Sequence, residues 1–236
     1  MFDLQNKVAV ITGAAGDLGK AVVRQFIEHK AIVCALDYKI GRLKNSTYKP
    51  KDNKNFYGFE EVDVTDRSAM LELAQEIQRQ VGVVDILVNT VGGFTSGEMV
   101  HELSSQTWRY MMDLNVQSLL NAAAAFVPGM VNKGYGKVIA IGARASMVGS
   151  AKNGVYAAAK AALLRFTESM AAELKPMNIQ VNCVLPGTID TLQNRQDMPN
   201  ADYSKWVTPE QVANVILFLA SAESDGISGA AIPVFG

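Results

Sequence analysis

Tyr156 and Lys160 are the residues whose types and spacing first suggest chemistry, because they stand four apart in the run Tyr-Ala-Ala-Ala-Lys. Alanine favours helix, and residues four apart share one helix face, so the phenol and the ammonium point into the same space. A neighbouring cation stabilises a phenolate and lowers the tyrosine pKa from its reference value of about 10. The pair therefore predicts a side chain that donates or accepts a proton near neutral pH. The alternative is an alanine-rich core helix whose polar residues face solvent.

Gly13, Gly16 and Gly19 form a second candidate group, between an apolar run at 8–11 and a helical pattern that follows. Glycines at such a turn let the backbone approach a phosphate, and the free N–H groups that start the next helix attract an anion. Glycines also end strands for structural reasons alone. The strand–turn–helix context nevertheless favours a nucleotide site.

Asp37 strengthens this prediction, because it stands at the end of the next apolar run. A carboxylate there can accept hydrogen bonds from the ribose hydroxyls of a dinucleotide, and it repels a 2′-phosphate. We therefore expect NAD(H) as the favoured cofactor. Lys39 and Arg42 lie nearby and keep NADP(H) as an alternative. A second interpretation of Asp37 is a helix N-cap or turn residue.

The elements that must position these residues alternate along the chain, with short apolar runs between helical patterns. Continuous apolar runs of this kind are typical of strands buried on both faces of a parallel sheet. We therefore predict an α/β fold over residues 1–236: a single-domain Rossmann-type, doubly wound, seven-stranded parallel sheet with helices on both faces. The polar stretch 39–55 is expected to be a helix remnant and a surface loop. Strands are predicted at 8–11, 31–36, 56–64, 85–89, 137–141, 179–185 and 231–234, and helices at 17–30, 66–81, 104–132 (kinked near Pro128), 153–174 and 208–221.

The composition bounds the remaining possibilities. The chain has 236 residues, of which 49% are hydrophobic and 19% charged, and its net charge is −1. It can build one large core, and so small a charge gives no field that recruits nucleic acid or an anionic membrane. No apolar run approaches the ~18 residues of a membrane span, and a structured pattern from Lys7 leaves no room for a signal peptide. We therefore expect a cytoplasmic protein without a metal, an unused sequon at 45–47, and buried, unpaired thiols at Cys34 and Cys183.

The glycine turn, Asp37 and the Tyr156–Lys160 pair occur in this order on one doubly wound domain. In this combination the sequence resembles the short-chain dehydrogenase/reductase family over essentially its whole length. The resemblance implies an NAD(P)H-dependent oxidoreductase with Tyr156, Lys160 and Asn115 as catalytic residues. Tyr156 would supply the proton, Lys160 would also hold the nicotinamide ribose, and Asn115 would complete the proton relay. It further implies a homodimer or homotetramer that pairs through the helices at 104–132 and 153–174.

The resemblance also assigns the cofactor contacts. The adenine would lie after the third strand, and a loop after the sixth would hold the nicotinamide carboxamide. Taken singly, each of these residues also has a structural interpretation: a turn glycine, a proline that ends a strand, or an asparagine that bonds its own backbone. The set expected to bind the cofactor is Gly13, Ala15, Gly16, Asp17, Leu18, Gly19, Asp37, Asp63, Val64, Asn89, Tyr156, Lys160, Pro186, Gly187, Thr188, Ile189 and Thr191.

Two positions depart from the family pattern. The middle glycine of the turn is Gly16, where the usual spacing would place it at residue 17. More important, Ala143 stands where the family usually has a serine whose hydroxyl binds the substrate oxygen. Loss of that donor removes a contact of about 1–3 kcal/mol from an alcohol or carbonyl site. Either the protein is a weakened carbonyl reductase or its substrate needs no such donor, and Ser146 and Ser150 are the nearest replacements.

One branch of the family, dihydropteridine reductase, resembles this pattern, with alanine in place of the serine and an Asp after the second strand. The resemblance implies hydride transfer to a small planar C=N or C=O acceptor, with quinonoid dihydropteridine as the specific candidate, and residues 188–207 as the substrate loop. One alternative is an alcohol dehydrogenase or ketone reductase with a displaced serine, and another is a non-catalytic NAD-binding sensor. The candidate substrate contacts are Phe94, Ala143, Arg144, Ser146 and Trp206.

Overall fold

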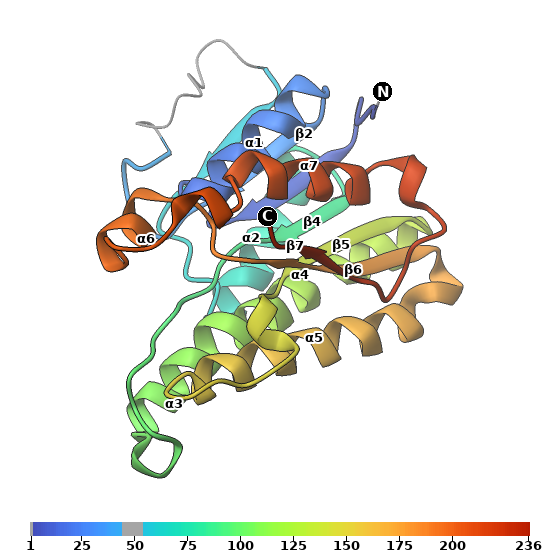
Figure 1. The fold of residues 1–236 in the computed structure, drawn as a ribbon. Coiled ribbons are helices and arrows are strands. Elements are labelled where there is room, and N and C mark those ends of the chain that lie inside the picture. Colours follow the sequence, from blue (N-terminus) through green and yellow to red (C-terminus); the bar gives the residue numbers. More distant parts are fainter. Residues whose placement is uncertain (1, 44–53) are drawn as a thin grey trace.

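Within the described residues, 2–43 and 54–236 of this computed structural model, seven parallel strands form one sheet (Figure 1). The strand order is β3-β2-β1-β4-β5-β6-β7. Successive strands are added outward from β1 to β3 on one side and from β4 to β7 on the other, so the order along the sheet reverses between β1 and β4. This reversal is the topological switch point at which open α/β sheets bind ligands. The predicted fold class is confirmed. The strands span β1 Val8–Thr12, β2 Ile32–Leu36, β3 Phe56–Phe59, β4 Ile86–Asn89, β5 Gly136–Ile141, β6 Ile179–Pro186 and β7 Ala231–Val234.

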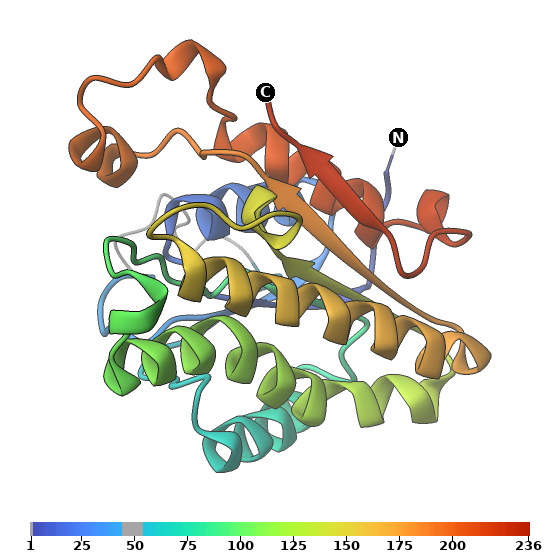
Figure 2. The ribbon, with the colours of Figure 1, turned by 60° about the horizontal axis from the view of Figure 1, so that its bottom comes forward.

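Helices cover both faces of the sheet. In Figure 1, α1 and α7 lie above it and pack against each other, while α2, α4 and α5 lie below it. Figure 2 shows α4 and α5 running side by side, and the loop that carries α6 projecting from the domain. The helices span α1 Asp17–Glu28, α2 Arg67–Gln80, α3 Ser105–Met112, α4 Ser118–Lys133, α5 Gly154–Leu174, α6 Leu192–Asp197 and α7 Pro209–Ala220.

Local sequence explains where these elements begin. Strands β1, β5 and β6 are buried at every position, as strands covered on both faces must be. The Asp66 carboxylate accepts a hydrogen bond from the Ser68 N–H at 2.8 Å and starts α2. Thr208 and Gln211 form a capping box at the start of α7, with Pro209 in its first turn.

Several features of the structure differ from the prediction. The predicted helix at 104–132 is interrupted by a π-helical turn at Asp113–Gln117, whereas α4 continues through Pro128, where we expected the kink. A π turn needs no proline, so the pattern of helix breakers does not reveal it. Strand β3 ends at Phe59, because Glu61 adopts a φ of 62° that a strand cannot hold. Helix α6 is an element that the apolar periodicity does not predict.

The apolar stretch from Ser105 to Lys133 is long enough by length and composition to cross a membrane. However, 44% of its most apolar window is buried inside the fold, and α4 packs against α2, β4 and β5. This is the position of a core helix in an α/β domain. Among the described residues, no group of three His, Cys, Asp or Glu side chains could hold a metal ion. Cys34 and Cys183 are buried free thiols, as expected, and the sequon at 45–47 lies outside the described residues.

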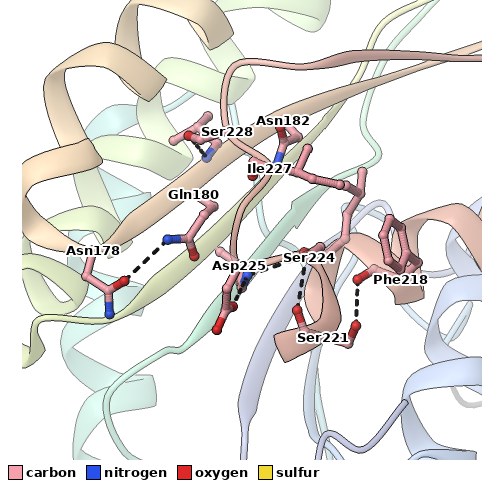
Figure 3. A network of polar contacts seen from close by, with 12 residues as sticks. Asn178, Gln180, Asn182, Phe218, Ser221, Ser224, Asp225, Ile227 and Ser228 are labelled. Carbon is pink, nitrogen blue, oxygen red and sulfur yellow. Dashed lines mark hydrogen bonds and ion pairs between the residues drawn. The ribbon is translucent and has the colours of Figure 1, made fainter. Parts of the chain in front are cut away.

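A polar network closes the amino ends of β5 and β6 (Figure 3). The buried ammonium of Lys137, on β5, lies 2.6 Å from a carboxylate oxygen of Asp225. On β6, the Asn182 side-chain amide donates to the carbonyl of Ile227 at 2.8 Å. The loop after α7 is thereby fastened to the sheet on the side of the amino ends of its strands, away from the predicted site residues.

Candidate active site

The predicted glycine turn lies at the carboxyl end of β1. Gly13 adopts a φ of +63°, a left-handed conformation that glycine holds without strain. A Cβ on Gly19 would lie 2.2 Å from the Gly13 carbonyl oxygen, so only glycine lets α1 pack this closely against the turn. Gly16 is the N-cap of α1 and brings no side chain to its first N–H groups, which include those of Asp17 and Leu18. The turn therefore leaves an anion-binding helix end open, despite the shifted middle glycine.

Asp37 is buried at the end of β2, and its carboxylate is held in place from two sides. One oxygen accepts a hydrogen bond from the Ala15 N–H at 3.1 Å, and the other accepts one from the Lys39 N–H at 3.1 Å. The Arg42 guanidinium lies 3.7 Å from the same carboxylate and donates to the Ala15 carbonyl at 3.0 Å. The acid and the glycine turn thus form one rigid unit, with a single arginine at its rim.

A cavity of ≈ 580 Å³ follows this carboxyl edge. The predicted residues Gly13, Gly16, Asp37, Asp63 and Val64 line it. A separate cavity of ≈ 780 Å³ between α2 and α4 is lined by none of the predicted site residues. Further residues that the sequence analysis does not assign to the site also line the first cavity: Leu36, Tyr38, Arg42, Val62, Thr65, Thr90, Val91, Gly92, Tyr110, Asp113 and Leu114.

Some of these unassigned residues carry a sequence signal and others do not. Thr90 directly follows Asn89 at the end of β4, and its hydroxyl donates to the Thr12 carbonyl at 2.6 Å. Its place after a predicted strand end would have sufficed to find it. Tyr110 and Asp113 come from α3 and the π turn, and only the tertiary fold brings them to the cavity.

The predicted residues Asn89 and Val64 are fixed by side chains from other elements. The Asn89 side-chain oxygen accepts a hydrogen bond from the Thr12 hydroxyl at 2.9 Å, which joins β4 to β1. The Val64 carbonyl accepts one from the Asn121 side chain on α4 at 3.0 Å. These bonds hold the ends of three separate strand connections at one edge of the sheet.

The predicted catalytic residues meet beside this cavity. Lys160 is buried on α5, donates to the Ile141 carbonyl at 2.8 Å and has its Nζ 5.9 Å from the centre of the Tyr156 ring. A Cβ built on Gly92 would lie 2.9 Å from the Asn115 side-chain oxygen and 3.0 Å from Lys160 Nζ. Gly92 therefore marks the point where two of the predicted catalytic residues, Asn115 and Lys160, approach each other, and a side chain there would displace them.

Asn115 is presented by the π turn at Asp113–Gln117. Its amide nitrogen donates to the carbonyls of Gly93 and Met111 at 3.1 and 3.0 Å, and its oxygen accepts from the Gly93 N–H at 3.2 Å. The asparagine is buried, so these bonds fix its amide in one orientation. It ties the loop after β4 to the helices below the sheet.

The pKa of Tyr156 moves in the direction opposite to our expectation. Burial raises the pKa of this phenol to about 12, and burial lowers the pKa of Lys160 to about 8. Desolvation disfavours the charged form of each group. In this cleft Tyr156 is a protonated phenol at neutral pH, so the predicted lowering of its pKa by Lys160 is wrong for this state.

Ala143 lies at the end of β5 and offers only a methyl group. The Ser146 hydroxyl oxygen accepts a hydrogen bond from the Ala143 N–H at 3.1 Å. The Ser146 side chain thus points back toward the end of β5, and its hydroxyl proton is still available to a further acceptor. Ser150 is exposed on the following loop.

The other candidate substrate contacts lie around the cleft. Phe94 is exposed and stands edge-on to the Tyr156 ring, with ring centres 5.0 Å apart. The Arg144 guanidinium lies 5.3 Å from the centre of the Phe235 ring. Trp206 packs on a neighbouring ring of its own loop, so it contributes to the packing of that loop in this state.

The segment expected to hold the nicotinamide carboxamide follows β6, which ends at Pro186. Gly187 donates to the Val234 carbonyl at 2.8 Å, so it continues the pairing with β7. Thr191 is the N-cap of α6. Thr188 and Ile189 connect these two points, and none of the five residues lines the ≈ 580 Å³ cavity.

Comparison with known proteins identifies the family. The family model described as short chain dehydrogenase matches residues 7–201. The chain is 30% identical to the 3-oxoacyl-[acyl-carrier-protein] reductase FabG of Thermotoga maritima over 99% of this chain and 98% of that protein. It is 31% identical to dehydrogenase/reductase SDR family member 6 of Rattus norvegicus, over 100% and 98% of the two chains. The crystal structure of gox2181 superposes with a TM-score of 0.91 at 26% identity, over 98% and 95%. The chain therefore belongs to the short-chain dehydrogenase/reductase family, whose members are NAD(P)(H)-dependent oxidoreductases.

Proposed function

We propose that this oxidoreductase uses NADH to reduce a small planar acceptor that carries a C=N or C=O bond. Three observations support a dinucleotide at this site: the uncapped start of α1, the fixed Asp37 carboxylate, and the ≈ 580 Å³ cavity along the carboxyl edge. The pyrophosphate would lie on the Gly13–Gly19 turn, and the adenosine in the ≈ 580 Å³ cavity. When bound, the nicotinamide supplies the hydride.

Residues of the chain would donate the proton and later restore it. Tyr156, whose pKa is raised to about 12, keeps its phenolic proton across the physiological pH range. It can therefore act as the acid that protonates the reduced acceptor. The Lys160 ammonium would stabilise the phenolate that this transfer leaves, and Asn115 would hold the relay that restores the proton.

Asp37 supports NADH over NADPH. Its carboxylate is buried at the end of β2, and the dianion of a 2′-phosphate placed beside it would meet a like charge. Arg42 supports the opposite preference, because its guanidinium lies at the same rim and can bind a phosphate. We propose the first reading because Asp37 is fixed by two backbone N–H groups, whereas Arg42 is exposed.

The acceptor is proposed from Ala143. This position has no side-chain donor for a substrate oxygen, and the oxygen of Ser146 is bonded to the backbone. A conjugated ring that takes hydride into a C=N system does not depend on one such donor, and exposed Phe94 offers a ring on which it can stack. Quinonoid dihydropteridine, the substrate of the branch that the sequence resembles, has this chemistry.

The test is NADH oxidation with quinonoid dihydropterin, followed by absorbance, in the wild type and in Tyr156→Phe. We expect turnover that Tyr156→Phe lowers by about 10²–10⁴-fold while NADH binding is retained. Tight NADH binding with no turnover of any acceptor would instead favour the non-catalytic sensor.

Reduction of a 3-oxoacyl group is the second candidate, because the Thermotoga maritima relative carries that name. Here the free hydroxyl proton of Ser146 would replace the missing serine donor. The test is turnover of ethyl acetoacetate. Robust reduction of this ketone, abolished by Ser146→Ala, would favour the 3-oxoacyl reading over the pterin reading.

We also propose a homodimer or homotetramer that pairs through α4 and α5 in the cytoplasm. The outer surface of α5 includes an exposed apolar side chain, Phe166. Light scattering after size exclusion tests the oligomer, and an exposed-face charge such as Phe166→Glu should dissociate it. Cell fractionation tests the location.

A further inference from the structure

An aromatic ring from α3 lies uncovered on the wall of the ≈ 580 Å³ cavity. Tyr110 lines this cavity and is 56% exposed. Within the described residues, its side chain makes no hydrogen bond and no ring contact. Aromatic side chains are typical of the walls of ligand pockets. The Tyr110 ring is therefore available to a ligand that enters the cavity.

The helical segment after β4 directs Tyr110 toward this cavity. The Asn121 amide on α4 donates to the Val64 carbonyl at 3.0 Å, which fastens the segment to the connection after β3. Asp113 and Leu114 follow Tyr110 by three and four positions, and both line the same cavity. Residues at these spacings share one helix face. The face that carries Tyr110 is therefore the one turned to the cavity.

A second exposed ring reaches the cavity from the other side of β1. Tyr38 directly follows Asp37 at the end of β2, lines the cavity and is 66% exposed. Strands β2 and β4 are the two neighbours of β1, and α3 follows β4 along the chain. Tyr38 and Tyr110 thus reach the cavity from opposite sides of the topological switch point. A planar ligand in the cavity can stack on an aromatic ring.

The charges around the cavity favour a neutral ring over an anionic group. The described lining residues include three carboxylates, Asp37, Asp63 and Asp113, against one guanidinium, Arg42. Arg42 lies 3.7 Å from Asp37, so its charge is already partly balanced. The Asp113 carboxylate, one turn from Tyr110, would repel a phosphate placed against the ring. An uncharged planar group therefore suits this wall best.

A dinucleotide has two planar groups, and the cavity distinguishes them. The nicotinamide must come close to Tyr156, which supplies the proton in the proposed function, and neither Tyr156 nor Lys160 lines this cavity. The turn that would hold the pyrophosphate does line it, through Gly13 and Gly16. The adenine is therefore the planar group that this cavity suits.

We propose that Tyr110 binds the adenine of the cofactor by stacking on its face. The inference rests on the proposed function, which places the adenosine in this cavity. Stacking between a base and an aromatic side chain stabilises a bound base without any hydrogen bond. Tyr110 would touch the cofactor but take no part in the transfer of the proton. Loss of its ring should therefore weaken every ligand that contains the adenosine and no ligand that lacks it.

Calorimetric titrations of the full chain, without any acceptor, test this assignment. The ligands are NADH, ADP-ribose, which keeps the adenosine half, and reduced nicotinamide mononucleotide, which keeps the other half. In Tyr110→Ala the dissociation constants of NADH and ADP-ribose should each rise by about tenfold, because both lose the same contact. The dissociation constant of the mononucleotide should stay within about twofold of the wild-type value, because its contacts lie elsewhere.

Further variants separate the aromatic face from other effects. Tyr110→Phe keeps the ring and loses only the hydroxyl, so each dissociation constant should stay within about twofold of wild type. Tyr110→Leu keeps apolar bulk without a flat π-face, and it should restore only part of the affinity lost in Tyr110→Ala. Trp108→Ala removes another exposed ring of α3, one that does not line the cavity. It should leave each constant at the wild-type value.

Unchanged binding of ADP-ribose by Tyr110→Ala would overturn the proposal, and so would an equal loss of affinity for the mononucleotide. A loss in Tyr110→Phe as large as that in Tyr110→Ala would also contradict it, because the hydroxyl and not the ring would then make the contact. A wild type that binds NADH but does not reduce dihydropterin contradicts the proposed acceptor alone, since no titration contains an acceptor.

Discussion

A buried lysine lies at each end of the strands, and the two lysines differ in the partner that their ammonium groups contact. At the amino edge, Lys137 lies 2.6 Å from the Asp225 carboxylate. At the carboxyl edge, Lys160 is equally buried, but the contact it makes is to the neutral carbonyl of Ile141 at 2.8 Å. Burial without a carboxylate lowers the pKa of Lys160 to about 8. At the amino edge the buried lysine charge is thus compensated by a carboxylate of the fold. At the carboxyl edge the lysine charge has no such carboxylate, so a ligand can compensate it.

The same contrast extends to the neighbouring groups. At the amino edge, the buried carboxylate of Asp85 is paired with Lys133 at 2.5 Å and accepts the Val8 N–H at 3.0 Å. At the carboxyl edge, α1 begins at Gly16 without a side-chain cap, beside a cavity of ≈ 580 Å³. Polar groups that are satisfied internally stabilise a fold, whereas polar groups that face an open cavity are available for binding. The difference alone favours the carboxyl edge as the place of the proposed site.

The largest loss of turnover is expected for Lys160→Met, at the carboxyl edge. Turnover of the acceptor should fall by about 10²–10³-fold, because the phenolate that forms at Tyr156 loses its neighbouring cation. The free energy of unfolding should not fall, because an ammonium without a carboxylate partner is removed from the interior. Steady-state kinetics and urea unfolding check the two halves. A strongly destabilised variant would show that Lys160 is a structural residue like Lys137.

Asp225→Asn is the converse change at the amino edge. It leaves the Lys137 ammonium buried without a carboxylate, and the unfolding free energy should fall by about 2–3 kcal/mol. The expected loss is smaller than the loss from breaking a fully buried ion pair, because the Asp225 side chain is 57% exposed and water can reach the Lys137 ammonium. Urea unfolding measures the loss. The value of kcat/KM should stay within about twofold of wild type, and a large loss of activity would contradict the separation of the two edges.

Asp37→Ala tests the cofactor end of the working edge. Without the carboxylate, the ratio of kcat/KM for NADH to that for NADPH should fall by about tenfold or more. The variant Arg42→Ala should move the ratio the other way, because it removes the cation that a 2′-phosphate would bind. Steady-state kinetics with both cofactors give the ratios. An unchanged ratio in Asp37→Ala would remove the basis for the NADH preference.

The smallest effect concerns the pH dependence of stability. The pKa of Lys160 is about 8 in the fold against an ordinary value of 10.5, so between these limits the unfolded chain binds the extra proton. The unfolding free energy of the wild type should therefore rise, relative to Lys160→Met, as the pH increases from about 8 to about 10.5. Below pH about 8 both states carry the proton and the difference should be flat. Urea unfolding of the two proteins across this range tests the sign, and a falling difference would contradict it.

Much of the fold could be predicted because local patterns coincide with burial. The continuous apolar run at 179–185 became β6, which is buried at all its positions. The π turn at Asp113–Gln117 could not be predicted, because its hydrogen bonds leave no mark in the apolar periodicity. Strand β3 was predicted, but its early end at Phe59 was not, since the strand-like sequence continues past the positive φ at Glu61.

The candidate site divides in the same way. Spacing on one helix was enough to place Tyr156 and Lys160 together, and strand ends were enough to place Asp37 beside the glycine turn. Tyr110 and Asp113 were not assigned, because they reach the cavity from segments whose position depends on tertiary packing. The internal bonds of residues 188–207 were likewise beyond a sequence argument, since they join side chains across an irregular loop.

The sequence by itself determined the alternation of strands and helices, the order of the strand ends along the chain, and the helix face that Tyr156 shares with Lys160. These follow from periodicity and spacing, which are local properties. The tertiary structure alone decided the environment of each charge. Lys137 and Lys160 are the same residue type, each within a predicted element, yet the partner of Lys137 lies 88 residues further along the chain. Burial and charge compensation depend on contacts between distant segments, and they decide which of the two lysines stabilises the fold and which is left free to act.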